Sequence, residues 1–320
     1  MTRFLPCILA FFLVLPASGQ PVDATVFSLT TLDASARGAG FAGSSSALPS
    51  QGVLSFLENP AHLRAEAHGQ LGLSLLNHVS ALQTGTVAYS RHLEGIGSVG
   101  AGLRFLGWGE IDRADALGEK QGTFSAGEFA LSAGLSRVLN PTTRYGANVH
   151  WLRSSIDGQA ANALALDAGI FRYNPDSRLG LSASIHSLGA VISSIGEESN
   201  RLPVDLRLGI SKRLLHLPFL FSVTAWDLTD FSGTDDDDTV LDNLLYHLKL
   251  GGAFQFSEHF EIRFGYDHRR HNALKVKSRL DLAGVSFGTG IVVKWVAVDY
   301  GYNSWSSFGG MHRFAVTTRL

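Results

Sequence analysis

From Gln70 onward the chain alternates apolar residues with small or polar ones at a period of two, and this pattern is the strongest constraint on its fold. In the segment 260–267, for example, Phe, Ile, Phe and Tyr occupy the even positions, while Glu, Arg, Gly and Asp occupy the odd ones. Successive side chains of a β-strand point to opposite faces, so each such segment has one apolar face. The chain is therefore predicted to be all-β.

Fourteen segments of this kind can be marked along the chain. Their centres are Leu73, Val87, Leu103, Leu131, Val149, Leu166, Leu181, Leu208, Val223, Gly252, Ile262, Phe287, Val298 and Val316. The connections between them alternate in length. Short connections include 92–96, 139–143, 174–177 and 257–259, whereas long connections include 107–127, 187–203, 228–246 and 268–281.

An even number of strands, short turns at one end and long loops at the other are typical of a transmembrane outer-membrane β-barrel. Closure of about 14 antiparallel strands satisfies every backbone hydrogen-bonding group in lipid. A large secreted β-sandwich is the alternative, but nothing in that fold forces the long loops to one edge. The sequence therefore predicts an integral barrel in the outer membrane of a Gram-negative cell, with outer-membrane lipid around it.

The composition agrees with a lipid-exposed wall. Hydrophobic residues make up 45% of the chain and charged residues only 17%, and there are 35 Gly in 320 residues. We expect the apolar residues on an outward, lipid-facing band and many of the small residues in a crowded lumen. The formal net charge is −2, so the chain lacks the excess of Lys and Arg that nucleic-acid binding normally requires, and no nucleic-acid partner is expected.

The first residues are predicted to be removed from the mature protein. A cationic start at Met1–Arg3, an apolar run at 4–15 and small residues at 17–19 predict a signal peptide over residues 1–19. Cys7 lies within it, so no thiol chemistry is expected afterwards. Residues 20–69 are predicted to form a hatch or plug segment and residues 70–320 the barrel, because 34–65 is small, neutral and only weakly periodic.

Two parts of the chain carry a family resemblance. The hatch contains Arg37-Gly38 and then Asn59-Pro60-Ala61-His62-Leu63, and the last strands contain the segments 282–290, 298–304 and 312–314. This chain resembles the PorV/PorQ branch of the FadL-like fourteen-stranded barrels, with an ending similar to PorQ. Arg37, Gly38, Asn59, Pro60, Ala61 and Leu63 are the candidate hatch motif, with a structural role.

The resemblance implies a non-enzymatic component of the type IX secretion system. It implies that the chain anchors a PorZ-like surface protein and other members of the complex that attaches secreted cargo to the cell surface. The alternative function is FadL-like uptake of hydrophobic small molecules. No cofactor is expected for either.

One acidic loop is a candidate docking site for that surface partner. Asp235, Asp236, Asp237 and Asp238 follow Phe231 in the connection 228–246. Consecutive carboxylates repel each other, and the spacing and glycine of an EF-hand are missing, so no metal site is predicted.

Catalytic patterns are present but poorly placed. Gly284–Gly288 matches G-x-S-x-G, yet Ser286 falls within a strand and not at a strand-to-helix turn. Gly38–Gly43 matches G-x-G-x-x-G without a helix that opens at its third glycine. His268 and His271 beside Asp267 leave a barrel hydrolase as a third hypothesis, but no catalytic residue is predicted.

The residues expected on the lumen face carry balanced charge. The acids are Glu128, Asp167, Asp205, Glu261, Asp267 and Asp299, and the bases are Arg104, Arg207, Lys249, Arg263, Arg313 and Arg319. A selective ion pore concentrates one sign of charge. The balance therefore predicts cross-strand ion pairs packed against a plug.

Overall fold

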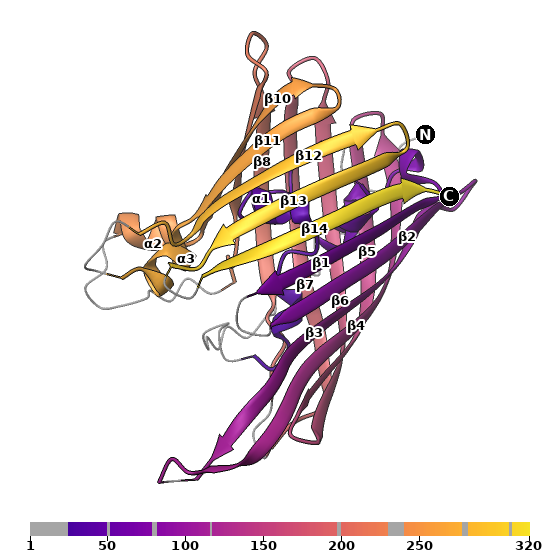
Figure 1. The fold of residues 1–320 in the computed structure, drawn as a ribbon. Coiled ribbons are helices and arrows are strands. Elements are labelled where there is room, and N and C mark those ends of the chain that lie inside the picture. The colour runs from indigo at the N-terminus through magenta and orange to yellow at the C-terminus, as the bar shows by residue number, and fades with distance from the viewer. Residues whose placement is uncertain are drawn as a thin grey trace.

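The chain folds into a closed barrel of fourteen antiparallel strands around an internal plug (Figure 1). The computed structural model describes residues 25–49, 52–78, 82–115, 117–196, 200–229, 240–276, 281–306 and 309–320. The strands are β1 Gln70–His78, β2 Gln83–Leu93, β3 Gly97–Ala114, β4 Lys120–Asn140, β5 Thr143–Ile156, β6 Gln159–Asn174, β7 Leu179–Ser193, β8 Asp205–Arg213, β9 Phe219–Ala225, β10 Leu248–Ser257, β11 Phe260–Asp267, β12 Val285–Val293, β13 Val296–Ser304 and β14 Gly310–Arg319. Each of the fourteen predicted centres lies in its own strand, so the predicted fold is confirmed.

The barrel closes where β1 pairs with β14, from Gln70 opposite Arg319 to His78 opposite Met311. A sandwich would leave the first and last strands at open edges, so this pairing excludes it. No helix in the described part of the chain has the length and apolarity needed to cross a bilayer.

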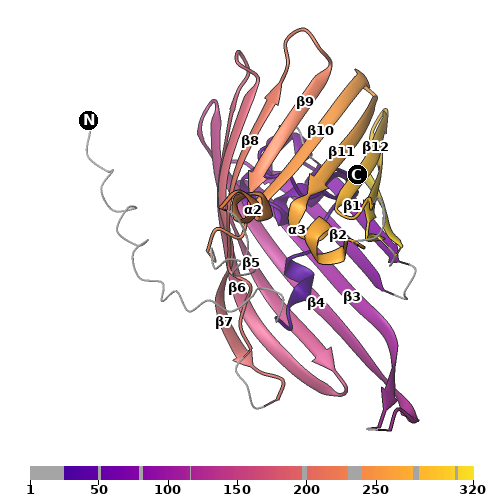
Figure 2. The ribbon, with the colours of Figure 1, turned by 90° about the vertical axis from the view of Figure 1, so that its left-hand side faces the viewer.

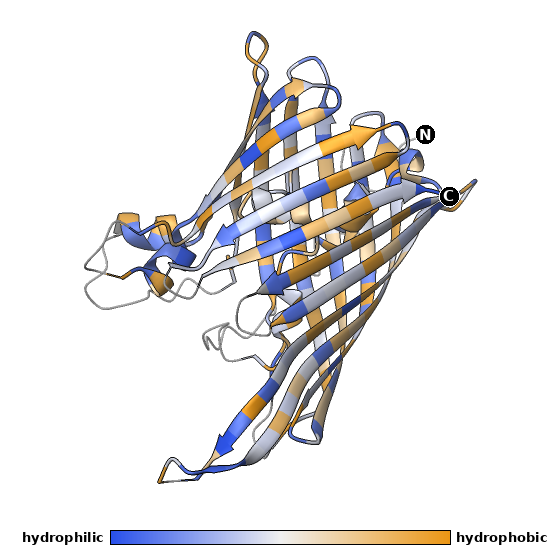
Figure 3. Ribbon diagram, in the orientation of Figure 1, coloured by the Kyte–Doolittle hydropathy of each residue, from blue (hydrophilic) through white to orange (hydrophobic). Residues whose placement is uncertain are grey.

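Large apolar side chains lie on the outside of the barrel. Leu73, Leu131 and Phe287, each near the middle of a strand, are 45%, 49% and 47% exposed. Figure 3 shows the resulting alternation of apolar and polar positions along the strands. Since such a surface is unfavourable in water, it is the band that contacts lipid.

The two ends of the barrel differ. Six short turns gather at one end, and the ends of the barrel chain meet there, where Leu320 N donates to Gly69 O at 2.8 Å. Short turns are periplasmic in outer-membrane barrels, which makes the opposite end external. Helices α2 (Val240–Tyr246) and α3 (His268–Leu274) lie at the external end (Figure 1).

Two predicted long loops are wrong in part. Residues 107–127 are mostly strand, because β3 continues to Ala114 and β4 begins at Lys120, and β7 continues to Ser193. Figure 2 shows β3 and β4 projecting beyond the rest of the barrel. Outside the lipid neither face must be apolar, so the alternation disappears while the backbone pairing continues.

Candidate functional site

The plug runs through the whole lumen. It starts at the external end, where Thr25 Oγ1 donates to Arg201 O at 2.9 Å, and it reaches β1 at the periplasmic end. Its regular elements are the 3-10 turns Ser28–Thr30, Val53–Leu57, Pro60–His62 and Ala65–Ala67 and the short helix α1, Ala36–Gly40.

The first half of the hatch motif lies at α1. Ser35 caps this helix by accepting a hydrogen bond from Gly38 N at 2.9 Å. Arg37 Nη2 lies 3.3 Å from Glu261 Oε1 of β11. A Cβ on Gly38 would overlap the carboxyl group of Glu58. A side chain at position 38 would therefore displace the Glu58 carboxyl group from its place beside α1.

The second half of the motif begins the turn Pro60–His62. Asn59 Oδ1 accepts from Ala61 N at 3.0 Å, and Pro60 occupies the first position of the turn. Ala61 and Leu63 are 0% and 1% exposed. This half packs on β4, β5 and β6, so the structure places the two halves against different walls of the barrel. The docking-loop residues Phe231 and Asp235–Asp238 lie outside the described residues, as does the signal segment 1–19.

A belt of glycines makes room for the plug. On the lumen face of eleven strands, a Cβ added to any of these residues would lie within 4 Å of a plug atom. They are Gly72, Gly100, Gly102, Gly134, Gly146, Gly169, Gly180, Gly209, Gly251, Gly265, Gly288 and Gly301. We call this set the glycine belt. It explains why the strands alternate large outward side chains with glycine inward.

A buried carboxylate ties the plug segments together. Glu58, 7% exposed, accepts hydrogen bonds from Ser35 Oγ at 2.7 Å and Ser45 Oγ at 2.5 Å. Burial, with the nearby Asp33, raises the pKa of Glu58 above its ordinary value. The three segments that meet here contact different strands, so Glu58 links the plug into one unit.

A layer of charged wall residues surrounds this unit. Arg263 Nη2 lies 2.6 Å from both Glu261 Oε1 and Asp299 Oδ1, and Arg207 pairs with Asp205. Lys249 and Asp267 are 3.9 Å apart. The predicted cross-strand ion pairs are confirmed for Arg263–Asp299 and Lys249–Asp267, whereas Arg263–Glu261 and Arg207–Asp205 each lie within one strand. Arg104 instead donates to Leu32 O of the plug at 2.8 Å.

Two histidines missed by sequence reasoning belong to the same layer. Asp167 Oδ2 lies 2.9 Å from His150 Nε2 and 3.2 Å from His186 Nδ1. With Arg104, Arg207 and Lys249 they line a cavity of only about 40 Å³ between plug and wall. This cavity holds little more than one water molecule.

External to the charged layer the lumen becomes apolar. Phe27 and Leu29 of the plug, 1% and 2% exposed, pack on inward side chains of β1, β3, β5, β6 and β14. The wall residues of this apolar chamber include Leu76, Leu106, Leu152, Ala161, Ala163 and Met311. An inward leucine is unusual in a water-filled barrel, whose interior is polar.

Glu128 of β4 fastens the plug inside this chamber. Its carboxylate accepts from Ser28 Oγ at 2.5 Å and from Leu29 N at 2.8 Å. Sequence reasoning placed Glu128 on the lumen face but assigned it no partner. We call residues 25–32 the plug arm.

Removing the Glu128 carboxylate should release the arm. Hydrogen bonds to charged groups contribute roughly 1.5–3 kcal/mol each, so we expect Glu128→Ala to expose the arm at least about tenfold more often. The measurement is the labelling rate of Leu29→Cys by a membrane-impermeant maleimide, with and without Glu128→Ala. Equal labelling rates would show that apolar packing alone holds the arm.

The catalytic patterns do not form a recognisable active site. Ser286, 1% exposed, lies within β12 and accepts from Asn303 Nδ2 at 2.7 Å. His271 Nδ1 contacts Ala283 O at 2.9 Å, and His268 Nδ1 contacts the Tyr266 hydroxyl at 3.2 Å. Within the described ranges, no three His, Cys, Asp or Glu side chains are grouped to hold a metal ion.

Comparisons with known proteins show the class of fold. No family model matches the chain, and no curated protein matches it in sequence. A FadL homologue of Pseudomonas aeruginosa has a TM-score of 0.52 at 11% identity, over 89% of this chain and 98% of its own. The toluene transporter TodX of Pseudomonas putida has a TM-score of 0.51 at 12% identity, over 85% of this chain and 93% of its own.

A TodX deletion mutant, described as a monoaromatic hydrocarbon channel, has a TM-score of 0.54 at 14% identity, over 88% of this chain and 96% of its own. The protein is thus a plugged fourteen-stranded outer-membrane barrel. Its particular form is the FadL-like fold, and this likeness supports an outer-membrane location.

Proposed function

We propose that this chain is a non-enzymatic outer-membrane channel for small apolar molecules. The observation that carries the proposal is the apolar chamber, where leucine, methionine and alanine side chains point into the lumen. A lumen that conducts ions or sugars needs polar groups there, whereas an apolar solute gains free energy by leaving water for such a surface.

The architecture of the neighbours supports the same function. TodX is described as a toluene transporter and as a monoaromatic hydrocarbon channel, and its structure aligns with this chain over most of its length. In our chain the plug arm fills the chamber with Phe27 and Leu29, side chains of the chemical kind that an apolar solute would replace. Below the chamber the plug packs against the charged layer and leaves a cavity of only about 40 Å³, so we expect passage to require the plug to move.

A polar substitution in the chamber tests the proposal. Burying one leucine side chain is worth about 1.5–3 kcal/mol, so Leu152→Asn should slow toluene uptake into proteoliposomes about tenfold or more. Leu117→Asn is the matched control, because Leu117 is 89% exposed at the tip of the external hairpin. Unchanged uptake in Leu152→Asn, with the barrel folded, would exclude the chamber from the route.

The second candidate is a scaffold of the type IX secretion system, and one observation favours it. The β3–β4 hairpin projects beyond the barrel at the external end and offers a surface to a PorZ-like partner (Figure 2). Affinity purification from detergent-solubilised outer membranes separates the two functions. Stoichiometric recovery of a large surface protein, with cargo released into the medium when the gene is deleted, supports the scaffold, and a solitary barrel supports the channel.

A further inference from the structure

The periplasmic end of the barrel contains a wide concave space beneath the plug. Its volume is about 1000 Å³, and we call it the periplasmic vestibule. Turn residues such as Pro141, Pro175 and His259 line its mouth, and Arg37 and Ser35 of the plug segment line its interior. Its size is at the upper end of the range for small-molecule sites.

The vestibule is lined by six arginines, and they are not equally neutralised. Arg37 and Arg263 pair with Glu261, and Arg64 Nε lies 3.3 Å from Glu66. These ion pairs neutralise the arginine charges on the plug and on the wall formed by β11–β13.

On the opposite side, Arg144, Arg178 and Arg213 line the same vestibule, and none of them forms an ion pair in the described part of the chain. Arg144 and Arg178 donate to the backbone carbonyls of Leu63 and Leu214, each at 3.3 Å. Arg213 donates to the side-chain amide of Gln255.

Two further carboxylates belong to the lining. Asp299 pairs with Arg263, and Glu258 makes no ion pair with the three arginines among the described residues. Glu66 lies close enough to act on the charge of Arg144, and Glu261 on that of Arg213, but neither forms an ion pair with it. With six Arg against Glu66, Glu258, Glu261 and Asp299, the lining keeps an excess of two positive charges.

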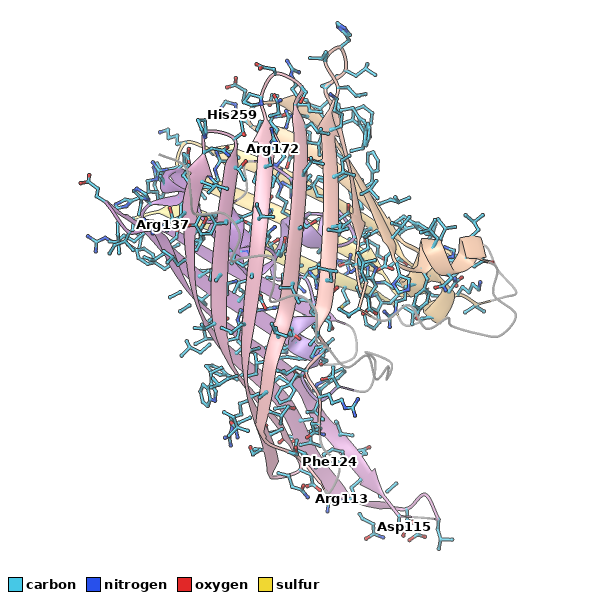
Figure 4. The ribbon with its side chains drawn as sticks, turned by 180° about the vertical axis from the view of Figure 1, so that it is seen from behind. Arg113, Asp115, Phe124, Arg137, Arg172 and His259 are labelled. Carbon is cyan, nitrogen blue, oxygen red and sulfur yellow. The ribbon has the colours of Figure 1, made fainter. Side chains whose placement is uncertain are left out.

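The turns around the vestibule are also positively charged. The segments 137–144, 172–178 and 212–219 contain six Lys or Arg and one Asp. Arg137, Arg172 and His259 lie together at this end, far from the external residues Arg113 and Asp115 (Figure 4). The external connection 226–247, by contrast, contains seven Asp and no Lys or Arg. The small net charge of the chain therefore conceals two ends of opposite charge.

We propose that the periplasmic vestibule is a docking site for an acidic segment of a periplasmic protein. Guanidinium groups bind carboxylates in bidentate geometry, and a concave positive site with low-dielectric walls concentrates its field on a negative partner. A projecting chain segment fits the concavity, whereas a cross-linked cell wall is too extended to enter it. Lipid head groups are separated from these three arginines by the barrel wall. The proposal is independent of the molecule that crosses the barrel.

The test uses the full-length purified protein in nanodiscs and a short labelled peptide of alternating glutamate and alanine. Peptides with glutamine or lysine in place of glutamate serve as probes of charge. We expect only the glutamate peptide to bind. The triple variant Arg144→Gln, Arg178→Gln and Arg213→Gln should weaken its binding by about tenfold, since each solvent-accessible pair contributes modestly.

The matched control also removes three positive charges at the periplasmic end, but from the outer surface of the barrel. Arg91, Arg137 and Arg172 are exposed on the outward faces of β2, β4 and β6, so their triple Gln variant should weaken peptide binding much less than the vestibule variant does. Heat-modifiable gel mobility confirms that each variant is folded. Equal weakening in both triple variants, or no binding of the glutamate peptide, overturns the proposal. A last outcome also overturns the proposal: the protein binds purified cell-wall sacculi through the same three arginines but does not bind the glutamate peptide. In that case the vestibule binds the cell wall.

Discussion

Adding a single methyl group at Gly265 should open the plugged lumen. A Cβ on this residue of β11 would lie 2.7 Å from both Phe41 O and Ala42 N of the plug. Both are backbone atoms, so no side chain can rotate away and the plug itself must move. Overpacking of this kind costs about 1–3 kcal/mol, so we expect Gly265→Ala to raise the open fraction roughly tenfold or more.

The measurement is the conductance of the purified barrel in planar lipid bilayers. The strand ladder between β10, β11 and β12 is unchanged by the substitution, so heat-modifiable mobility should persist. Gly107→Ala is the control, because a Cβ at Gly107 has no atom within 4 Å. A folded Gly265→Ala protein with the conductance of the unmodified barrel would show that the glycine belt does not set the fit of the plug.

The second large effect concerns the pH dependence of plug docking. Burial raises the pKa of Glu58, so the carboxyl group binds its proton more tightly in the docked plug than in a solvated one. Docking should therefore be strongest below the ordinary value of 4.5 and weaken as pH rises through the raised pKa. Burial lowers the pKa of His62, a buried histidine of the plug, to about 4, so its imidazole stays neutral over most of that range.

We expect bilayer conductance of the unmodified barrel to increase with pH above 4.5, and that of Glu58→Gln to stay low and flat. The amide is neutral at every pH and keeps an oxygen that accepts from Ser35 or Ser45. Glu66→Gln is the control, because the Glu66 side chain is 66% exposed and should leave the pH dependence intact. If the conductance of Glu58→Gln rose with pH in the same way as that of the unmodified barrel, another group would be responsible for the pH dependence.

The lipid-exposed wall was predictable because its chemistry repeats. Every strand needs apolar residues outward, and the crowded lumen needs small ones inward, so a period of two survives in segments as different as 98–105 and 260–267. The external halves of β3, β4 and β7 were missed, since strands outside lipid are held by backbone pairing and need no alternation. The predicted segments end where the strands leave the lipid, because outward residues beyond that point need not be apolar.

The site was predictable only in part. Small residues in the hatch and on the lumen face pointed to a plug, and the structure places Gly38 and Asn59 in tight plug contacts. Glu58 was not predicted as a contact of the plug. In the structure the Glu58 carboxylate accepts hydrogen bonds from Ser35 and Ser45. A single sequence cannot tell such a buried carboxylate apart from one that faces solvent.

By itself, the sequence determined an all-β barrel of fourteen strands, its outward apolar band and a plug of small residues, because each follows from local periodicity or composition. The tertiary structure alone decided which residues meet inside. The apolar chamber joins Phe27 to Leu152, and the vestibule brings Arg144 beside the turns of Arg178 and Arg213. Such contacts depend on strand register and closure, which bring distant residues to the same height in the lumen, and no local pattern records that height.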